Sequence, residues 1–170
     1  MVNIKKRLKN KKGFVSIYVI IGLAILLPFM FFVSIDMPNY MSMNRKIKNT
    51  LDNAVSTAIT CLDETSVTNG SLVINTQEAE ARAKEVIKKS FGLNDDMTVN
   101  ENSLISDTPT IRFKVINNPN AEPTYSTPNG EYTIKNPSVI IYAEIPVKGL
   151  FLYKTEVTIK HTAISQVQFK

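Results

Sequence analysis

The sequence predicts an α+β protein in which a long amino-terminal transmembrane helix continues into an amphipathic helix, followed by a second, shorter helix and an antiparallel β-sheet. Three observations predict this fold class. Residues 13–35 contain no charged side chain, apolar residues then recur every three or four positions, and from about Thr98 onward they alternate with polar residues. The 170 residues match the size of one domain. We expect a basic leader (1–12), a transmembrane helix (13–35) and one α+β domain (36–170).

The uncharged segment has the length and composition of a membrane-spanning helix. Fifteen of its 23 residues are Leu, Ile, Val or Phe. At about 1.5 Å per residue they reach about 34 Å, enough to cross a hydrocarbon core of about 30 Å. Pro28 removes one backbone hydrogen bond and is expected to kink the helix without ending it. A cleaved secretory signal is the alternative, but it has a shorter apolar region and a small-x-small site that residues 34–36 do not provide.

Charges on either side of this segment indicate its orientation. Six cations precede it: Lys5, Lys6, Arg7, Lys9, Lys11 and Lys12. Asp36 follows it, and the next cation is Arg45. Because positive residues stay on the cytoplasmic side, we expect a cytoplasmic amino terminus held to anionic lipid, with residues 36–170 extracytoplasmic at the cell membrane.

The basic leader also accounts for the whole net charge of +5. Beyond residue 12 the chain has 14 basic and 15 acidic residues, a sum of −1. Such a domain has no basic surplus with which to bind phosphates. We therefore expect membrane lipid, and no nucleic acid, among the partners.

An apolar stripe with helical spacing continues beyond the anchor. Its members are Met43, Ile47, Leu51, Ala54, Val55, Ala58, Ile59 and Leu62. They predict an amphipathic helix from about Asn39 to Leu62, and Pro38 marks either its first turn or a bend. The stripe must cover a sheet and also meet neighbouring molecules. We assign this membrane and partner packing to Ile47, Leu51, Ala54, Val55 and Ala58.

A second helix is predicted between Asn75 and Gly92. Asn75 is a favourable N-cap, Glu78 stands three residues later as in a capping box, and Gly92 follows the last apolar residue. The buried stripe is expected to contain Ala79, Ala83, Val86, Ile87 and Phe91. Before this helix, Asn69-Gly70 predicts a turn and residues 71–75 a short strand.

Alternating patterns predict the strands of the sheet. Ile111, Phe113 and Val115 alternate with charged residues, and further strands are expected over 131–135 and 138–147. Pro146 cannot donate to a ladder, so its end of the strand is placed at a sheet edge. In the last run the apolar residues are Val157, Ile159, Ala163, Val167 and Phe169, which predicts a half-buried antiparallel strand. Residues 117–130 carry several turn dipeptides and predict a long polar connection.

No combination of residues in the chain suggests catalysis. Cys61 and His161 are the only residues of their kinds, and neither a GxGxxG nor a GxxxxGK[ST] motif occurs. We expect Cys61 to be buried and His161 to be a hydrogen-bonded core or rim residue. The pairs Asp63-Glu64 and Asp95-Asp96 are expected in solvated turns. The sequence thus predicts neither an enzyme nor a cofactor or metal site.

The order of these segments resembles a known family. A basic leader, then Lys12-Gly13-Phe14 and an apolar helix that runs into an amphipathic one ahead of a strand-rich domain, is similar to a type IV pilin or pseudopilin. More narrowly, Asp36, Arg45 and the run 51–58 (LDNAVSTA) resemble the amino-terminal region of TadE/TadG-like proteins of tight-adherence (Flp) pili. This likeness covers about residues 11–60. Segments 146–151 and 157–163 resemble the same group's carboxyl-terminal part more loosely.

The resemblance implies a processing site at Gly13 and Phe14, where a prepilin-type peptidase would cut. In this family a Glu usually stands five residues after the cleaved glycine, and here that position is Tyr18. The family's carboxylate pairs with a neighbouring subunit's amino terminus inside the membrane, which a tyrosine cannot do. Either the chain is not cleaved after Gly13, as in an anchored TadG-like member, or it is a minor subunit that joins through other contacts.

The resemblance implies a structural function. The expected protein is a membrane-anchored, pilin-like subunit or assembly factor of a surface pilus or secretion apparatus, whose partners are other pilin-like or assembly subunits. The alternative is a membrane-tethered binding or sensor domain that recognises a ligand through residues 117–130. An ectoenzyme would need carboxylates that converge in a pocket.

Overall fold

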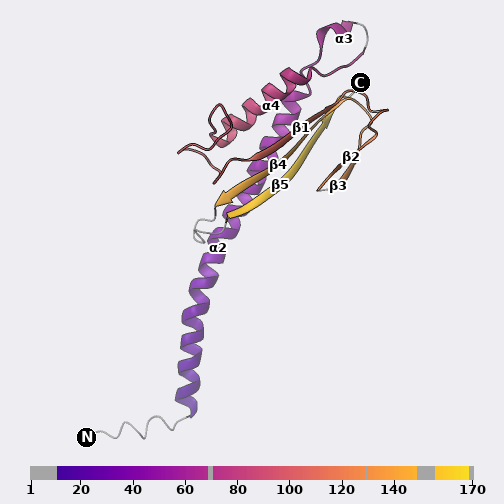
Figure 1. Ribbon diagram of the computed structural model, residues 1–170. Helices are drawn as coiled ribbons and strands as arrows, with labels where there is room; N and C mark the ends of the chain where they lie inside the picture. The colour runs from indigo at the N-terminus through magenta and orange to yellow at the C-terminus, as the bar shows by residue number, and fades with distance from the viewer. Residues whose placement is uncertain (1–10, 69–70, 129, 149–155, 169–170) are drawn as a thin grey trace, which may run out of the picture.

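The computed structural model describes residues 11–68, 71–128, 130–148 and 156–168 and confirms an α+β fold with a long apolar amino-terminal helix (Figure 1). Its helices are α2 (Lys11–Ala58), α3 (Glu64–Thr68) and α4 (Thr76–Phe91). Its strands are β1 (Thr110–Ile116), β2 (Thr124–Thr127), β3 (Gly130–Thr133), β4 (Ser138–Lys148) and β5 (Glu156–Gln166). Most of the leader, the Asn69-Gly70 turn, residues 149–151 and Phe169 lie outside the described residues.

Helix α2 joins the predicted membrane helix and the predicted amphipathic helix into one element of 48 residues. It contains both Pro28 and Pro38, so Pro38 does not mark a first turn. The helix ends at Ala58 rather than Leu62, because the backbone tightens: the Cys61 N–H donates to the Ala58 carbonyl (3.1 Å). Leu62 instead forms an isolated bridge with Ile74. That bridge is the only strand-like pairing within the described part of the predicted strand 71–75.

Helix α4 confirms the predicted helix between Asn75 and Gly92. The Asn75 side chain accepts a hydrogen bond from the Glu78 N–H, and Gly92 ends the helix in the left-handed conformation at φ 66°. Only this half of the capping box forms, because the Asn75 N–H donates to the Cys61 carbonyl (2.8 Å) and the Glu78 carboxylate pairs with Arg82 at 2.7 Å. The buried residues of the helix are Ala79, Ala83, Ile87 and Phe91, with Val86 partly buried.

Three antiparallel strands form the main sheet in the order β1-β4-β5. Strand β4 is central in the sheet, but the end that carries Pro146 lies at an edge, as predicted, because β1 pairs with β4 only as far as Glu144. The Pro146 carbonyl accepts from the Ser106 N–H on the β1 side (2.9 Å). In an antiparallel strand the nitrogen and the carbonyl of one residue point to the same side. The Pro146 nitrogen therefore faces the side where β1 has already ended, so its missing N–H removes no hydrogen bond from the β1–β4 pairing.

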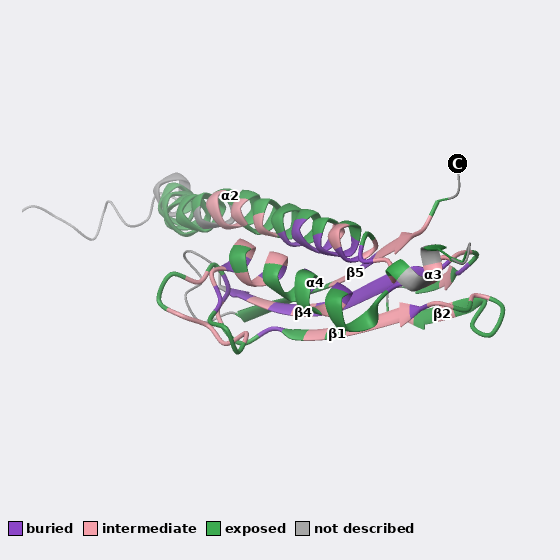
Figure 2. Ribbon diagram, turned by 90° about the horizontal axis from the view of Figure 1, so that it is seen from above, coloured by how far each residue is buried: buried purple, intermediate pink, exposed green. Residues whose placement is uncertain are grey.

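The two faces of the sheet are covered by different elements. Helices α2 and α4 pack on one face, where they enclose a large apolar core together with alternate residues of β4 (Figure 2). On the other face, Ile140 is buried with Ile116 and Ile134, and Tyr125 packs against them. Strands β2 and β3 form this cover as an antiparallel hairpin. The segment 117–130 is therefore not only the polar connection that its composition predicts, since β2 lies within it.

Candidate membrane anchor and base of the domain

The first third of α2 extends away from the rest of the protein (Figure 1). Every residue from Val15 to Phe31 is exposed, and Ile25 retains 69% of its accessible surface. Among the described residues, α2 is the one helix long and apolar enough to cross a membrane by length and composition. Water is an unfavourable surrounding for such a surface, since each apolar side chain left exposed forgoes about 1.5–3 kcal/mol of burial. The domain does not cover these side chains, and the hydrocarbon core of a bilayer would bury them.

Prolines interrupt the hydrogen bonding of α2 at two places without ending the helix. Pro28 has no N–H to donate to the carbonyl of Ala24, and Pro38 has none for Ser34. Near the second interruption, the Ser34 hydroxyl donates to the Met30 carbonyl (2.7 Å). A hydroxyl that bonds back to a carbonyl four residues earlier is a feature that membrane helices tolerate and that bends them slightly.

The five residues assigned to membrane and partner packing lie instead in the protein's own core. Ile47, Leu51, Ala54, Val55 and Ala58 are each at most 2% exposed and belong to the cluster between α2, α4 and the sheet. Their contacts are therefore intramolecular, and they present no free surface to a neighbouring chain. The helical stripe was correctly predicted, but the sheet and α4 cover these five of its residues, while Met43, Ile59 and Leu62 are partly buried.

The predicted processing site lies at the beginning of α2. The helix starts at Lys11, so the backbone of Gly13 and Phe14 belongs to its first turn. Tyr18, at the position where pilins carry Glu, is 63% exposed on the apolar part of the helix. Gly22 has open space around it, since a methyl group at its Cα would meet no atom within 4 Å. Cleavage after Gly13 therefore stays a prediction.

A set of exposed apolar side chains surrounds the place where α2 enters the domain. They are Met37, Tyr40, Met41, Leu104 and Val157. We call these five residues the basal rim. These residues are not predictable from the sequence, because the spacing of Met37, Tyr40 and Met41 is the same as that of the buried stripe. The sequence pattern does not indicate where the domain ceases to cover the helix.

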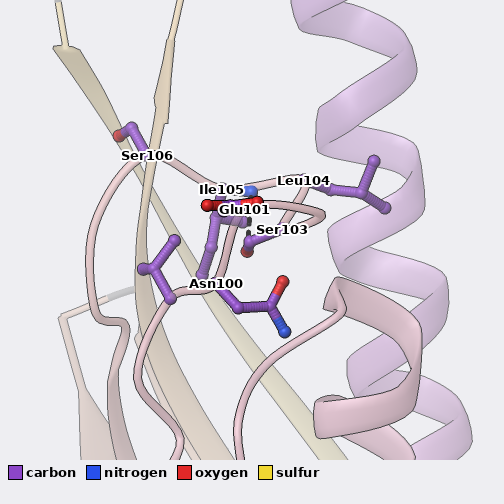
Figure 3. A pocket seen from close by; sticks show the side chains of 7 residues that line it. Asn100, Glu101, Ser103, Leu104, Ile105 and Ser106 are labelled. Atoms are coloured by element: carbon purple, nitrogen blue, oxygen red, sulfur yellow. Dashed lines mark hydrogen bonds between the residues drawn. The ribbon is translucent and has the colours of Figure 1, made fainter.

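Leu104 borders a small hollow at the same end of the domain (Figure 3). The hollow measures about 280 Å³ and is lined by Val99, Asn100, Glu101, Ser103, Leu104, Ile105 and Ser106. The Ser103 hydroxyl is engaged with the Phe91 carbonyl (3.1 Å). In Figure 3 the Leu104 side chain points toward α2, whereas Ser106 lies at the opposite side of the group. The hollow forms within one loop, and four of its seven lining residues are polar. Among the described residues, the buried Ser106 hydroxyl has no hydrogen-bond partner.

Cys61 has the predicted buried position, and His161 lies at the rim of the core, but the predicted hydrogen bond of the His161 side chain is not formed with any described residue. Cys61 is buried, and this burial raises the pKa of its thiol. His161 is half-buried on the sheet face toward α2. Burial lowers its pKa, which the charge of Asp52 partly offsets and that of Lys48 reinforces. Among the described residues, no three His, Cys, Asp or Glu side chains are grouped closely enough to hold a metal ion.

The acidic pairs in the sequence take part in local turns. The Asp63 carboxylate accepts a hydrogen bond from the Ser66 N–H (2.9 Å) at the start of α3. Asp95 pairs with Lys88 (2.7 Å), and Asp96 accepts from the Thr98 N–H (3.0 Å). The hydrogen bonds from Thr98 lower the pKa of Asp96. These carboxylates stabilise turns, in agreement with the prediction.

A small polar network occupies the face of the sheet that carries the hairpin. The Tyr142 hydroxyl donates to Glu144 (2.6 Å), and Lys160 on β5 pairs with the same carboxylate (3.2 Å). These two donors lower the pKa of Glu144, that from Tyr142 most strongly. Arg112 lies over the Tyr142 ring, 5.9 Å from its centre. All four side chains are accounted for by contacts across three strands.

Functional inference depends on these physical features alone. No protein-family model matches the chain, and neither a curated protein nor a solved structure is detectably similar to it. The feature with the clearest chemical consequence is the exposed apolar part of α2.

Proposed function

We propose that the protein is a single-pass membrane protein that serves as a structural, pilin-like subunit or anchored assembly factor of a surface pilus or secretion apparatus, of the TadE/TadG-like kind. Its amino terminus would lie in the cytoplasm and its α+β domain outside. The observation that carries this proposal is the continuity of α2. One helix is exposed and apolar over its first part and forms part of the domain core over its last part.

Continuity of the helix favours a structural role because anchor and domain share one helix, with no separate linker between them. Leu51 and Ala58 are fully buried against α4 and the sheet, so the end of α2 cannot turn without disrupting the core. The direction of the anchor therefore fixes the direction of the domain. Lateral packing of anchors in a bilayer would place the attached domains side by side, which an assembling apparatus requires.

The alternative role as a binding or sensor domain depended on a free loop at residues 117–130. Part of that segment is strand β2, whose Tyr125 packs against the cluster of Ile116, Ile134 and Ile140. Lys114 also holds Glu122 of this segment at 3.1 Å. The segment is thus used to cover the protein's own sheet, and we favour the structural role.

Mass analysis of the mature protein is the first experiment. The protein would be isolated from cells with and without a prepilin-type peptidase, and its amino terminus would be determined. Cleavage after Gly13 supports a filament subunit, whereas an intact chain in the membrane fraction supports an anchored assembly factor. A full-length product that is soluble and monomeric after gentle cell breakage would contradict both.

Topology requires an introduced cysteine, because the native Cys61 is buried and is expected to stay unlabelled in the folded protein. In a Cys61→Ala background, Gln77→Cys places a thiol on the exposed first turn of α4. A membrane-impermeant maleimide should label this variant on intact cells. Labelling that occurs only after lysis would reverse the proposed orientation.

Self-association can be tested within the exposed part of α2. Ile25→Cys in the same Cys61→Ala background places a thiol on the most exposed side chain of the anchor. Oxidative cross-linking in membranes should give a dimer that a matched Gln77→Cys variant, located far from the anchor, does not give. Equal cross-linking of both variants would indicate random collision and argue against helix packing.

A further inference from the structure

The large apolar side chains of the domain whose exposure the structure describes are exposed only at the basal rim. After residue 33, and leaving aside Val67 and residues 149–155 and 169–170, which are not described, they are Met37, Tyr40, Met41, Leu104 and Val157. Soluble surfaces carry single exposed apolar residues at scattered positions. Here they come from three separate elements: α2, the loop after α4, and the beginning of β5.

These elements meet at the end of the domain that is nearest the anchor. The Leu104 N–H donates to the carbonyl of Phe91, the last residue of α4 (3.0 Å). Two residues later, Ser106 binds Pro146 close to the end of β4. Figure 1 shows this end of the sheet lying beside α2 where the helix leaves the domain.

Val157 can be placed at the same level along α2. His161 lies near Lys48 and Asp52, whose charges influence it. Val157 precedes His161 by four strand residues, a distance of about 13 Å along the strand. A helix covers the same distance in about nine residues. His161 is level with about residue 50 of α2, midway between Lys48 and Asp52, so Val157 is level with about Met41.

The helix itself shows where the cover of the domain ends. Tyr40 precedes Ile47 by seven residues, two helical turns, and so lies on the same face. Ile47 is fully buried, Met43 is partly buried, and Tyr40 is 41% exposed. The apolar stripe therefore continues beyond the domain toward the anchor, and its exposure increases in that direction.

We propose that the basal rim is a second lipid-contact surface, which rests in the interfacial layer of the bilayer and seats the domain on the membrane. The inference depends on the proposed membrane anchor. If the hydrocarbon crossing ends near Ile35, Met37 to Met41 lie about 3–9 Å farther along the helix axis. The polar layer on each side of a bilayer is about 5–7 Å thick, so Met37 falls within it, and Tyr40 and Met41 lie at its outer border, from which their side chains can reach into it.

The chemistry of the rim suits this layer better than it suits a second protein. Tyrosine is enriched at membrane–water interfaces, where its ring is apolar and its hydroxyl reaches water. Arg45 and Lys46 are exposed on the next turn of α2, and long cationic side chains can extend toward lipid phosphates. The rim is also continuous with the apolar surface of the anchor. Lipid contact explains this continuity, whereas a docking site for another protein would not require it.

Single tryptophans provide the test, because the chain contains none. Four variants of the full chain would be reconstituted in phosphatidylcholine vesicles with and without brominated acyl chains, which quench tryptophan on contact. Leu104→Trp and Val157→Trp report on the rim, Leu26→Trp on the anchor, and Gln77→Trp on the far end of the domain. Cys61 should remain unreactive in each variant if the domain is folded.

We expect lipids brominated near the headgroup to reduce the fluorescence of both rim variants about twofold, as for side chains in the interfacial layer. Leu26→Trp should be quenched more by bromines placed deep in the chains, and Gln77→Trp should not be quenched. Rim variants that behave like Gln77→Trp while Leu26→Trp is quenched would refute the seated domain and leave the anchor intact. Failure of all four to respond would remove the anchor as well.

A second copy of the chain is the other occupant that the experiment distinguishes. In that case the two rim variants would show blue-shifted emission, independent of brominated lipid and lost on dilution of protein in the membrane. Such a result would overturn lipid contact and identify the rim as a protein interface.

Discussion

Replacing Leu51 by alanine tests whether the last part of α2 is a structural member of the domain. Leu51 is fully buried in the core between α2, α4 and the sheet. If α2 were only a stalk beside an independent domain, shortening this side chain would have little effect. If it is part of the core, the domain should lose a large share of its stability.

The expected loss follows from burial. Leucine to alanine removes the equivalent of about three methylene groups, each worth about 0.8 kcal/mol when buried. The unfilled cavity adds to this, so the free energy of unfolding should fall by about 3–5 kcal/mol. For a domain of this size each kcal/mol corresponds to about 3–5 °C in Tm, and we expect a decrease of at least about 10 °C.

Leu26→Ala is the matched control, because Leu26 belongs to the same helix but is 52% exposed. Both variants would be measured as full chains in detergent micelles, by near-ultraviolet circular dichroism and by the reactivity of Cys61, which becomes accessible on unfolding. The control should change the domain's unfolding free energy by less than about 0.5 kcal/mol. Equal Tm values for the wild type, Leu51→Ala and Leu26→Ala would refute the assignment of α2 to the core.

Three further predictions concern single contacts. The Asn117 side chain accepts a hydrogen bond from the Ile74 N–H (2.8 Å) and donates one to the Ile74 carbonyl (3.1 Å). Asn117→Ala leaves both backbone groups unpaired, so it should destabilise the domain by about 2–4 kcal/mol in denaturant titrations. Asn117→Asp should restore only part of this loss. Gly92→Ala should cost about 1–2 kcal/mol because Gly92 has φ 66° and a Cβ would meet the Asn102 carbonyl oxygen at 3.1 Å, whereas Gly22→Ala, in open space, should leave the domain unchanged. Burial lowers the pKa of His161, so the unfolded chain takes up the proton first as pH falls below about 6.5, and stability should decrease from there until the folded pKa is reached. His161→Gln should remove this part of the pH dependence, and identical pH profiles of the two proteins would contradict it.

Those features of the fold that depend on neighbours in the sequence were predictable from it. The length of the apolar segment, the spacing of Ile47, Leu51 and Ala58, and the cap residues Asn75 and Gly92 all act within about one helical turn or along one helix. Such interactions do not depend on the rest of the chain. Helices α2 and α4, the central strand and the last strand were therefore placed within a few residues of their positions, whereas the short helix α3 was not predicted.

Tertiary structure decided the features that depend on distant parts of the chain. Pro146 lies in the central strand because β1 stops short of it, which no local pattern reveals. Strand β2 forms in a polar segment because Tyr125 finds an apolar surface on the far face of the sheet. Asn117 was one polar residue among several in the predicted connection, and only the fold brings it to Ile74.

The candidate site divides in the same way. Length and hydropathy alone identify the candidate anchor, because a bilayer requires a continuous apolar helix of about this length. Which part of the apolar stripe is left uncovered depends on where α4, β4 and β5 end beside α2, and so on packing between segments more than a hundred residues apart. The sequence alone therefore determined that the chain has a helix long and apolar enough to span a membrane, whereas the fold decided that Ile47, Leu51 and Ala58 belong to the core and that Met37, Tyr40 and Met41 remain exposed.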